Sequence, residues 1–236
     1  MRDRAGRELD TAILDIDGTL VDSVYEHTVA WSRAFRDVGV AVPGHTLHRA
    51  IGMGAERLVA HVAGDAVERA MGDRIRAIHD AEFGRLGARV RLLPGADRVI
   101  GELKRRGLAV VVATSGNERD TERALDAVPD SALLDAVVTG DEAERGKPAP
   151  DLLDAALARV GGRRAVVVGD SPWDARAGRE RDLLVICVLT GGFGAAELTG
   201  AGADVVCASL VELLERTDTT AWASADLGGG GRSALV

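Results

Sequence analysis

The chain has 236 residues, of which 46% are hydrophobic and 28% are charged, enough for one substantial α/β core or a core with a small second domain. Its formal net charge of -8 argues against a nucleic-acid-binding protein, which needs a basic face to replace counterions. No run approaches the roughly 18 to 20 apolar residues of a membrane span, and the N-terminal residues lack an apolar signal region, so we expect a cytoplasmic protein without membrane contact.

The first predicted element is a short buried strand over residues 12–17, AILDID. The block that follows, residues 22–93, shows helical spacing of its apolar residues and is predicted to be entirely helical. Its expected helices cover residues 24–38, 43–51, 55–62 and 66–86.

From residue 94 onward, apolar strands alternate with amphipathic helices, which predicts an α/β fold with a doubly wound parallel sheet covered on both faces. The first strand needs this sheet as its partner, so the helical block is an insertion. We therefore expect a catalytic core over 1–21 and 94–217, a helical cap domain over 22–93, and a flexible Gly-rich tail over 218–236. The expected strands cover 108–114, 136–139, 165–170, 183–189 and 203–207, and the expected helices cover 96–106, 119–127, 151–160, 173–181 and 210–216.

Polar residues follow three of the predicted strands. Asp15 and Asp17 end the first, Thr114 ends another, with Ser115 as the alternative one place along, and Asp170 ends a third. Ligands bind at the carboxyl ends of the strands in such sheets, so we expect these side chains to meet. In an extended chain residues i and i+2 point the same way, which places the first two carboxylates around one small volume.

Lysine usage adds a further candidate. Among 29 basic residues only Lys104 and Lys147 are lysine, so each invites a specific explanation. Lys147 lies in the loop GKPAPD, and a compact ammonium suits a point-charge role near carboxylates.

Taken in order, DIDGT at residues 15–19, Thr114, the lysine of GKPAPD and the sequence GDSPWDA resemble the four motifs of the haloacid dehalogenase-like superfamily. The resemblance covers about residues 11–217 and implies a Rossmann-like core with a small helical cap of the C1 type. By position, it makes Asp15 the nucleophile that forms an aspartyl-phosphate and Asp17 the general acid and base. Thr114 and Lys147 would bind the phosphoryl group.

The resemblance also implies a Mg²⁺ site. Its ligands would be the carboxylates of Asp15 and Asp170 and the backbone carbonyl of Asp17, while Asp174 would bind through water or orient the site. Asp17, as a second acidic group beside Asp15, should resist losing its proton, which suits an acid near neutral pH. A calcium loop is the alternative, but Leu20 stands where such a loop wants glycine.

Within the cap, His27, Arg49, Gly52 and Gly54 are candidates for substrate contact. Each has an alternative interpretation: a core or hinge histidine, a surface charge, and a helix-breaking turn. The other four histidines, His45, His48, His61 and His79, show no metal-ligand spacing and are predicted to lie on the surface.

The function expected from these residues is a Mg²⁺-dependent phosphatase of a small phosphorylated metabolite, such as a sugar phosphate. One alternative is a phosphomutase resembling β-phosphoglucomutase, because His27 falls where those enzymes carry a cap histidine. Another, from a different class, is a catalytically silent binding protein on the same fold. The expected partner is the small phosphorylated substrate, with no nucleic acid and no membrane, and the protein is expected to be a monomer or a small homo-oligomer.

Overall fold

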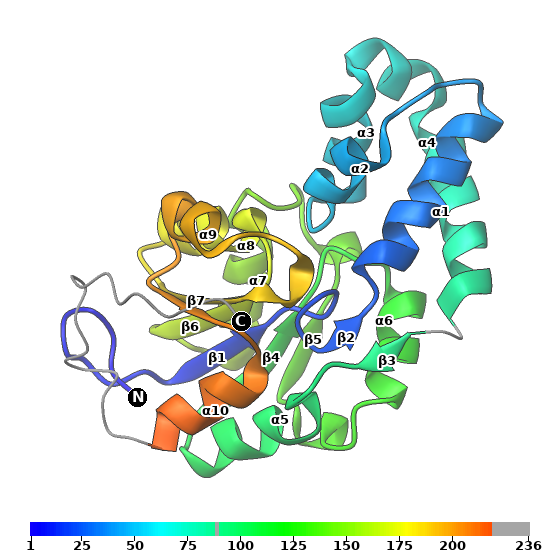
Figure 1. Cartoon of the computed structure of the whole chain (residues 1–236). Coiled ribbons are helices and arrows are strands. Elements are labelled where there is room, and N and C mark those ends of the chain that lie inside the picture. The colour runs from blue at the N-terminus through cyan, green and yellow to red at the C-terminus, as the bar shows by residue number, and fades with distance from the viewer. Residues whose placement is uncertain (88–89, 219–236) are drawn as a thin grey trace, which may run out of the picture.

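The computed structural model describes residues 1–87 and 90–218, so nearly all of the tail predicted for 218–236 lies outside the described residues. Its main feature is a six-stranded, fully parallel sheet in the order β5-β4-β1-β6-β7-β8, which confirms the predicted fold class (Figure 1). The strands are β1 Thr11–Leu14, β4 Ala109–Ala113, β5 Ala136–Val138, β6 Ala165–Gly169, β7 Leu184–Val188 and β8 Val205–Cys207.

Helices cover both faces of this sheet, as expected for near-continuous apolar strands. One face packs against α5 Ala96–Arg105 and α10 Leu210–Asp218, and the other against α7 Asp151–Val160, α8 Pro172–Glu180 and α9 Ala195–Ala201. Alternate residues of β1 enter the two cores, Leu14 on the first face and Ile13 on the second. The remaining core elements are α6 Glu118–Asp126 and the 3-10 turns η2 Ser131–Leu133, η3 Gly140–Glu142 and η4 Leu189–Gly191.

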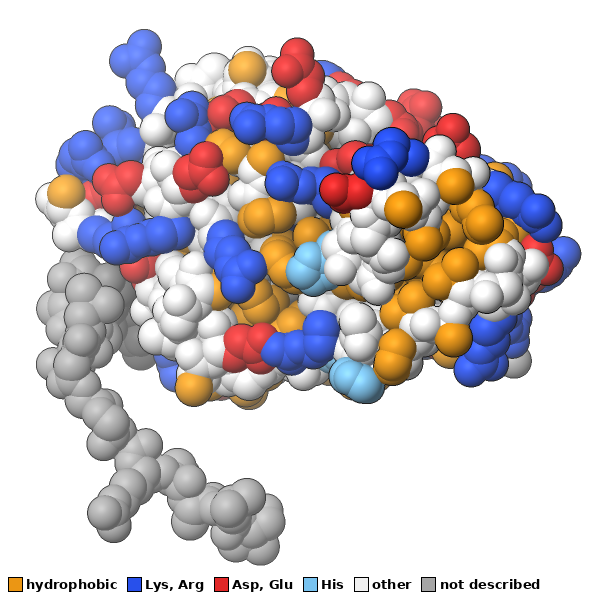
Figure 2. Space-filling view, turned by 90° about the horizontal axis from the view of Figure 1, so that it is seen from above, with side chains coloured by type: hydrophobic (Ala, Val, Ile, Leu, Met, Phe, Trp, Pro, Cys, Tyr) orange, Lys and Arg blue, Asp and Glu red, His pale blue; other side chains and the backbone are white. Residues whose placement is uncertain are grey.

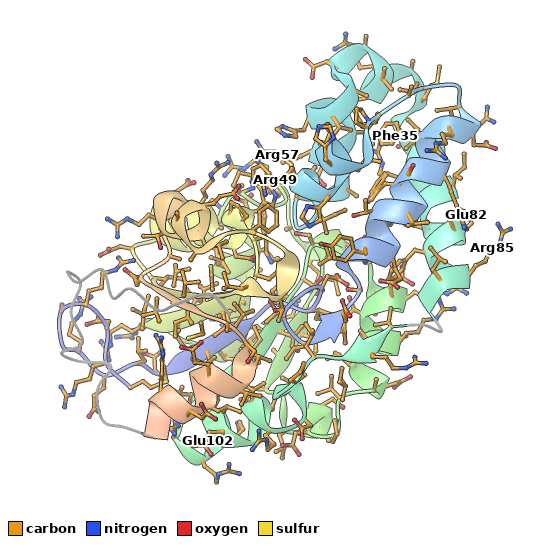
Figure 3. All side chains as sticks on the ribbon, in the orientation of Figure 1. Phe35, Arg49, Arg57, Glu82, Arg85 and Glu102 are labelled. Atoms are coloured by element: carbon orange, nitrogen blue, oxygen red, sulfur yellow. The ribbon has the colours of Figure 1, made fainter. Side chains whose placement is uncertain are left out.

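The block between β1 and α5 forms a helical insert that rises from the end of the sheet where β1 ends (Figure 1). Its helices share their own apolar core, in which the Phe35 side chain is fully buried (Figure 3). Trp173 from α8 joins this core, so the insert packs directly on the sheet domain. The helices are α1 Val24–Asp37, α2 Gly44–Ala50, α3 Ala55–Ala63 and α4 Asp65–Leu86.

The prediction that residues 22–93 are entirely helical is wrong at both ends. Strands β2 Val21–Asp22 and β3 Arg91–Leu92 pair antiparallel. This pairing joins the segment that enters the insert to the segment that leaves it. Leu93 N–H also donates to the Leu20 carbonyl at 2.9 Å. Two-residue strands are too short to show an alternating pattern, and their pairing partners lie far apart in the sequence.

Two further features concern the surface. Acidic and basic side chains are interspersed over the face seen in Figure 2, with apolar side chains exposed among them. Among residues 1–87 and 90–218, no helix is long and apolar enough to cross a membrane.

Candidate functional site

The candidate site lies at the carboxyl ends of three neighbouring strands. Asp15 follows β1, Thr114 follows β4 and Asp170 follows β6, and β1 is hydrogen-bonded to both of the other strands. The strand order switches sides at β1, with β4 and β5 on one side and β6, β7 and β8 on the other, and open α/β sheets bind ligands at such a point. All three residues are at most 5% exposed. Gly18, at φ +79°, turns the chain where any Cβ would collide with the Asp170 carboxylate.

Lys147 is the cation of the site, as the motif suggested. Its side chain is buried, and Nζ lies 2.7 Å from Asp15 Oδ1, 2.7 Å from Asp174 Oδ1 and 3.3 Å from the Ala113 carbonyl. Burial alone would lower the pKa of Lys147, but Asp15 and Asp174 outweigh that effect and raise it. The lysine is therefore charged, and it joins β1, the end of β4 and α8.

Three carboxylates lie close together beside this ammonium, and two of them contact it. One oxygen from each of Asp15, Asp170 and Asp174 lies within 4.8 Å of the others, and all three residues are buried. Burial, followed by the neighbouring carboxylates, raises the pKa of Asp170 well above its usual range and that of Asp15 to about 7. Three buried acids with one lysine leave an excess of negative charge, and hard oxygen donors of this kind suit a divalent cation such as Mg²⁺. The residues present therefore fit the metal that the resemblance implies.

Asp174 is placed by its helix as well as by Lys147. Ser171 caps the N-terminus of α8, its Oγ lies 2.5 Å from Asp174 Oδ2, and the backbone N–H of Ser171 also donates to that oxygen. This capping box uses Oδ2 of Asp174, so Oδ1 is available to contact Lys147. The same side chain therefore caps α8 and belongs to the acid cluster.

The Asp17 carboxylate makes its hydrogen bonds outside this cluster. Its Oδ1 accepts a hydrogen bond from Ser23 Oγ at 2.5 Å and lies 3.2 Å from His27 Nε2. Burial would raise the pKa of Asp17, but His27 and Ser23 outweigh it and hold the pKa below its usual value. The expectation that a neighbouring acid keeps Asp17 protonated is thus wrong, because the nearest partners are a histidine and a hydroxyl from the cap.

A cavity of about 440 Å³ opens between the insert and the sheet domain beside these residues. Its base carries Asp15 and Thr114, with Thr114 Oγ1 accepting from the Gly116 N–H at 3.0 Å. The volume suits a small molecule, and the walls combine apolar and polar side chains. Wall residues from the insert include His27, Gly52, Arg76 and Phe83, and those from the sheet domain include Asn117 and Asp120.

The cap candidates divide between the cavity and its rim. His27 and Gly52 line the cavity, and the Gly52 carbonyl accepts from Ser115 Oγ at 3.2 Å. Gly54 lies outside the lining, with its N–H donating to the Lys147 carbonyl at 3.4 Å. Arg49 also lies outside it, at the end of the insert nearest the core (Figure 3).

Arg49 contacts the sheet domain instead of the cavity. Its guanidinium forms an ion pair with Glu197 of α9 and lies 4.5 Å from the centre of the Phe193 ring. The neighbouring His48 is half-buried, and its Nε2 lies 3.0 Å from the Gly191 carbonyl. Both residues hold α2 against the 191–197 segment, which is a cap-docking role.

His79 is the largest miss of the sequence reasoning. It was predicted on the surface, but it is 6% exposed, lines the cavity and stacks on Trp31. His45 and His61 are exposed as predicted. Ser23, which binds Asp17, was also missed. The sequence carries one signal for His79, because positions 75, 79, 83 and 86 continue the buried stripe of α4 at helical spacing.

Comparison with known proteins gives one family and several relatives. A model of haloacid dehalogenase-like hydrolases matches residues 9–181. The chain is 34% identical over 219 residues to the plasmid phosphoglycolate phosphatase of Cupriavidus necator, covering 86% of this chain and 91% of that protein. It is 32% identical over 185 residues to the validoxylamine A 7'-phosphate phosphatase of Streptomyces hygroscopicus subsp. limoneus, covering 76% and 85%. A hydrolase from Pseudomonas syringae superposes with a TM-score of 0.83 at 31% identity, covering 89% of this chain and 98% of that one.

Proposed function

We propose, from the premise that this chain belongs to the haloacid dehalogenase-like hydrolases, that it is a Mg²⁺-dependent phosphatase of a small phosphorylated metabolite. A sugar phosphate or related polyol phosphate is the substrate class, and the reaction passes through a phosphorylated Asp15. The two relatives named above are phosphatases of small phosphorylated metabolites, and they support this class.

The observation that carries the proposal is the ion pair between Lys147 and Asp15 at the floor of the cavity. Nζ holds Oδ1 of Asp15 at 2.7 Å, which leaves Oδ2 of that carboxylate available as a nucleophile. The ammonium also stands beside the position where phosphoryl oxygens would gather negative charge. A buried carboxylate without such a partner would be protonated and would not attack phosphorus.

In the proposed reaction, Asp15 attacks phosphorus and the P–O bond to the leaving oxygen breaks. Asp17, which His27 and Ser23 keep ionised in the free protein, takes up a proton as the phosphorylated substrate binds and donates it to that oxygen. Asp17 then takes a proton from the water that attacks the phosphorylated Asp15, which releases inorganic phosphate, frees the Asp15 carboxylate and returns Asp17 to its protonated form. Thr114 orients the phosphoryl group, and Lys147 neutralises part of its charge. When bound by Asp15, Asp170 and the Asp17 carbonyl, with Asp174 beside them, the Mg²⁺ supplies Lewis-acid stabilisation of the phosphoryl oxygens.

The test is hydrolysis of p-nitrophenyl phosphate with Mg²⁺ and again with EDTA. We expect phosphate release that needs the metal and that falls by about 10³-fold or more in Asp15→Asn, because the amide oxygen is a poor nucleophile. No metal-dependent release above the Asp15→Asn control would contradict the proposal and favour the silent binding protein. A panel of phosphorylated metabolites then narrows the substrate.

The phosphomutase alternative requires the insert to hold a second phosphate. Of the described insert residues, Arg76 is the cation that lines the cavity, and it is already paired with Glu68 at 2.9 Å and Asp73 at 2.8 Å. Because Arg76 is already paired, this observation favours phosphate hydrolysis over phosphomutase activity. With a hexose 1-phosphate as substrate, a 6-phosphate product without inorganic phosphate would reverse that choice.

A further inference from the structure

A row of hydrogen-bonded side chains runs from Asp17 into the insert. His27 Nε2 lies 3.2 Å from Asp17 Oδ1, and His27 Nδ1 lies 3.1 Å from His79 Nε2. His79 Nδ1 lies 2.9 Å from Asp80 Oδ1, at the solvent end of the row. His27 belongs to α1, whereas His79 and Asp80 belong to α4. The mechanism above uses Asp17 but gives no part to His79 or Asp80.

The hydrogen bonds from His27 through His79 to Asp80 have one direction. The Asp80 carboxylate can only accept, so His79 Nδ1 carries a hydrogen. Burial lowers the pKa of His79, so its ring is neutral with a single N–H, and Nε2 must accept. His27 therefore donates from Nδ1 to His79. The His27 ring cannot turn over without losing that bond, and its Nε2 is held toward Asp17.

Aromatic rings also pack against the faces of His27 and His79. The Phe83 ring stacks on His27 with centroids 3.6 Å apart, and the Trp31 ring stacks on His79 with centroids 4.0 Å apart. Trp31 and Phe83 are both buried. Stacked rings in a packed core keep one orientation. The two histidines are therefore held by packing and by hydrogen bonds together.

This arrangement determines which oxygen of Asp17 is free. Oδ1 is occupied by Ser23 and His27, whereas Oδ2 faces Gly116, where a Cβ added to the glycine would lie 3.9 Å away. We propose that His79, held by Asp80, is a positioning residue for the general acid: it fixes His27, which in turn orients Asp17 so that Oδ2 meets the leaving oxygen. The proposal rests on the proposed function, in which Asp17 protonates that oxygen.

A positioning role can be distinguished from a merely structural role by how the loss of activity depends on the basicity of the leaving group. When the P–O bond breaks, its electron pair goes to the leaving oxygen, which takes the proton of Asp17. Phenyl phosphate needs that proton much more than p-nitrophenyl phosphate, because nitrophenolate is the weaker base, and the two substrates have similar size. The ratio kcat/KM reports the steps through phosphoryl transfer, so it is measured for both substrates at saturating Mg²⁺.

In His79→Gln, we expect kcat/KM for phenyl phosphate to fall by about tenfold or more, while that for p-nitrophenyl phosphate falls by less than about twofold. Asp80→Ala removes the half-exposed end of the row without opening the core, and we expect a selective loss of about threefold. Asp80→Asn keeps an acceptor oxygen and should stay near the wild-type ratio. If His79→Gln does not fold, the selective loss in Asp80→Ala tests the proposal instead.

Glu82→Ala is the matched control. Glu82 lies two residues further along α4, on its outer side beside Arg85, and binds Arg33 and Arg85 outside the cavity (Figure 3). Equal losses on both substrates in the His79 and Asp80 variants, or the same selective loss in Glu82→Ala, would overturn the proposal. A wild-type protein that releases phosphate from neither substrate would instead overturn the proposed function.

Discussion

The sheet domain and the helical insert contribute to the same cavity in different ways. In the sheet domain, Asp15, Thr114 and Asp170 each follow a strand, and backbone pairing of β4, β1 and β6 brings them together. In the insert, His27 and His79 meet because α1 packs on α4. Position in the first case follows from local sequence and sheet order. In the second it follows from side-chain packing, which local sequence specifies less completely.

The two regions meet at several places, and two of these join the insert to loops of the sheet domain. One joins residues 52–57 of the insert to the loop of Lys147, where Glu56 accepts from the Gly146 N–H at 2.8 Å. The other joins α2 to the 191–197 segment through His48 and Arg49. If the core supplies chemistry and the insert supplies enclosure, substitutions in the two regions should have effects of different size and kind.

The largest effect is expected from Lys147→Ala in the core. Removing the ammonium leaves Asp15 and Asp174 buried without their cation. We expect a loss of about 3–5 kcal/mol in the free energy of unfolding and a fall in kcat of about 10²-fold or more. Urea denaturation and phosphate release measure the two quantities.

Lys104→Ala is the natural control for that experiment. Lys104 also binds a carboxylate, Asp135, at 2.7 Å, but both side chains are about a third exposed. An exposed pair of this kind contributes less than about 1 kcal/mol, and activity should be unchanged. Similar losses in the two variants would show that the buried cluster has no special role.

Gly52→Ala should give an intermediate effect at the first contact point. Gly52 has φ +93°, and a Cβ there would lie 2.8 Å from Ser171 Oγ and 3.2 Å from the Trp173 ring. The insert would have to shift away from the core, so we expect kcat/KM to fall by about tenfold or more.

Gly64 provides the control, because it has φ +87° but nothing within 4 Å of an added Cβ. Gly64→Ala should therefore cost stability through the backbone alone, about 1–2 kcal/mol, and leave kcat/KM unchanged. An equal loss of activity in both variants would refute this explanation.

Arg49→Ala should give the smallest effect. Its ion pair with Glu197 is 43% and 37% exposed, so the loss of stability should be below about 1 kcal/mol. Because Arg49 lies outside the cavity, kcat/KM should fall by the same factor, about twofold, for every substrate tested. A double-mutant cycle with Glu197→Ala measures the coupling. A fall in kcat/KM that differs between substrates would contradict this assignment and indicate that Arg49 contacts the substrate.

The sequence predicted the core more completely than the insert, and the reasons are physical. The family resemblance and the parallel sheet are confirmed. The sheet was predictable because strand residues such as Val166 and Val168 are apolar and buried. Strands β2 and β3 were missed because each has two residues. Helix α9 was missed because only Leu198 of its seven residues is buried.

The same contrast applies to the site. Motif spacing brought Asp15 and Lys147 to attention, and they are in contact although 132 positions apart. The partners of Asp17 were not predictable in this way, because the interpretation considered only its neighbouring acid. His27 and Ser23 reach Asp17 from the insert, and they reverse the direction of its pKa shift. No motif identifies His79, whose contact with His27 depends on how two helices pack.

The most direct test of the account is a search for the phosphorylated carboxylate itself. Asp17→Asn removes the base that activates water, so with Mg²⁺ and p-nitrophenyl phosphate the protein should accumulate the mass of one phosphoryl group, and peptide mapping should locate it on Asp15. The double variant Asp15→Asn/Asp17→Asn should gain nothing. Turnover with no phosphorylated protein at any time, or label on a residue other than Asp15, would contradict the account.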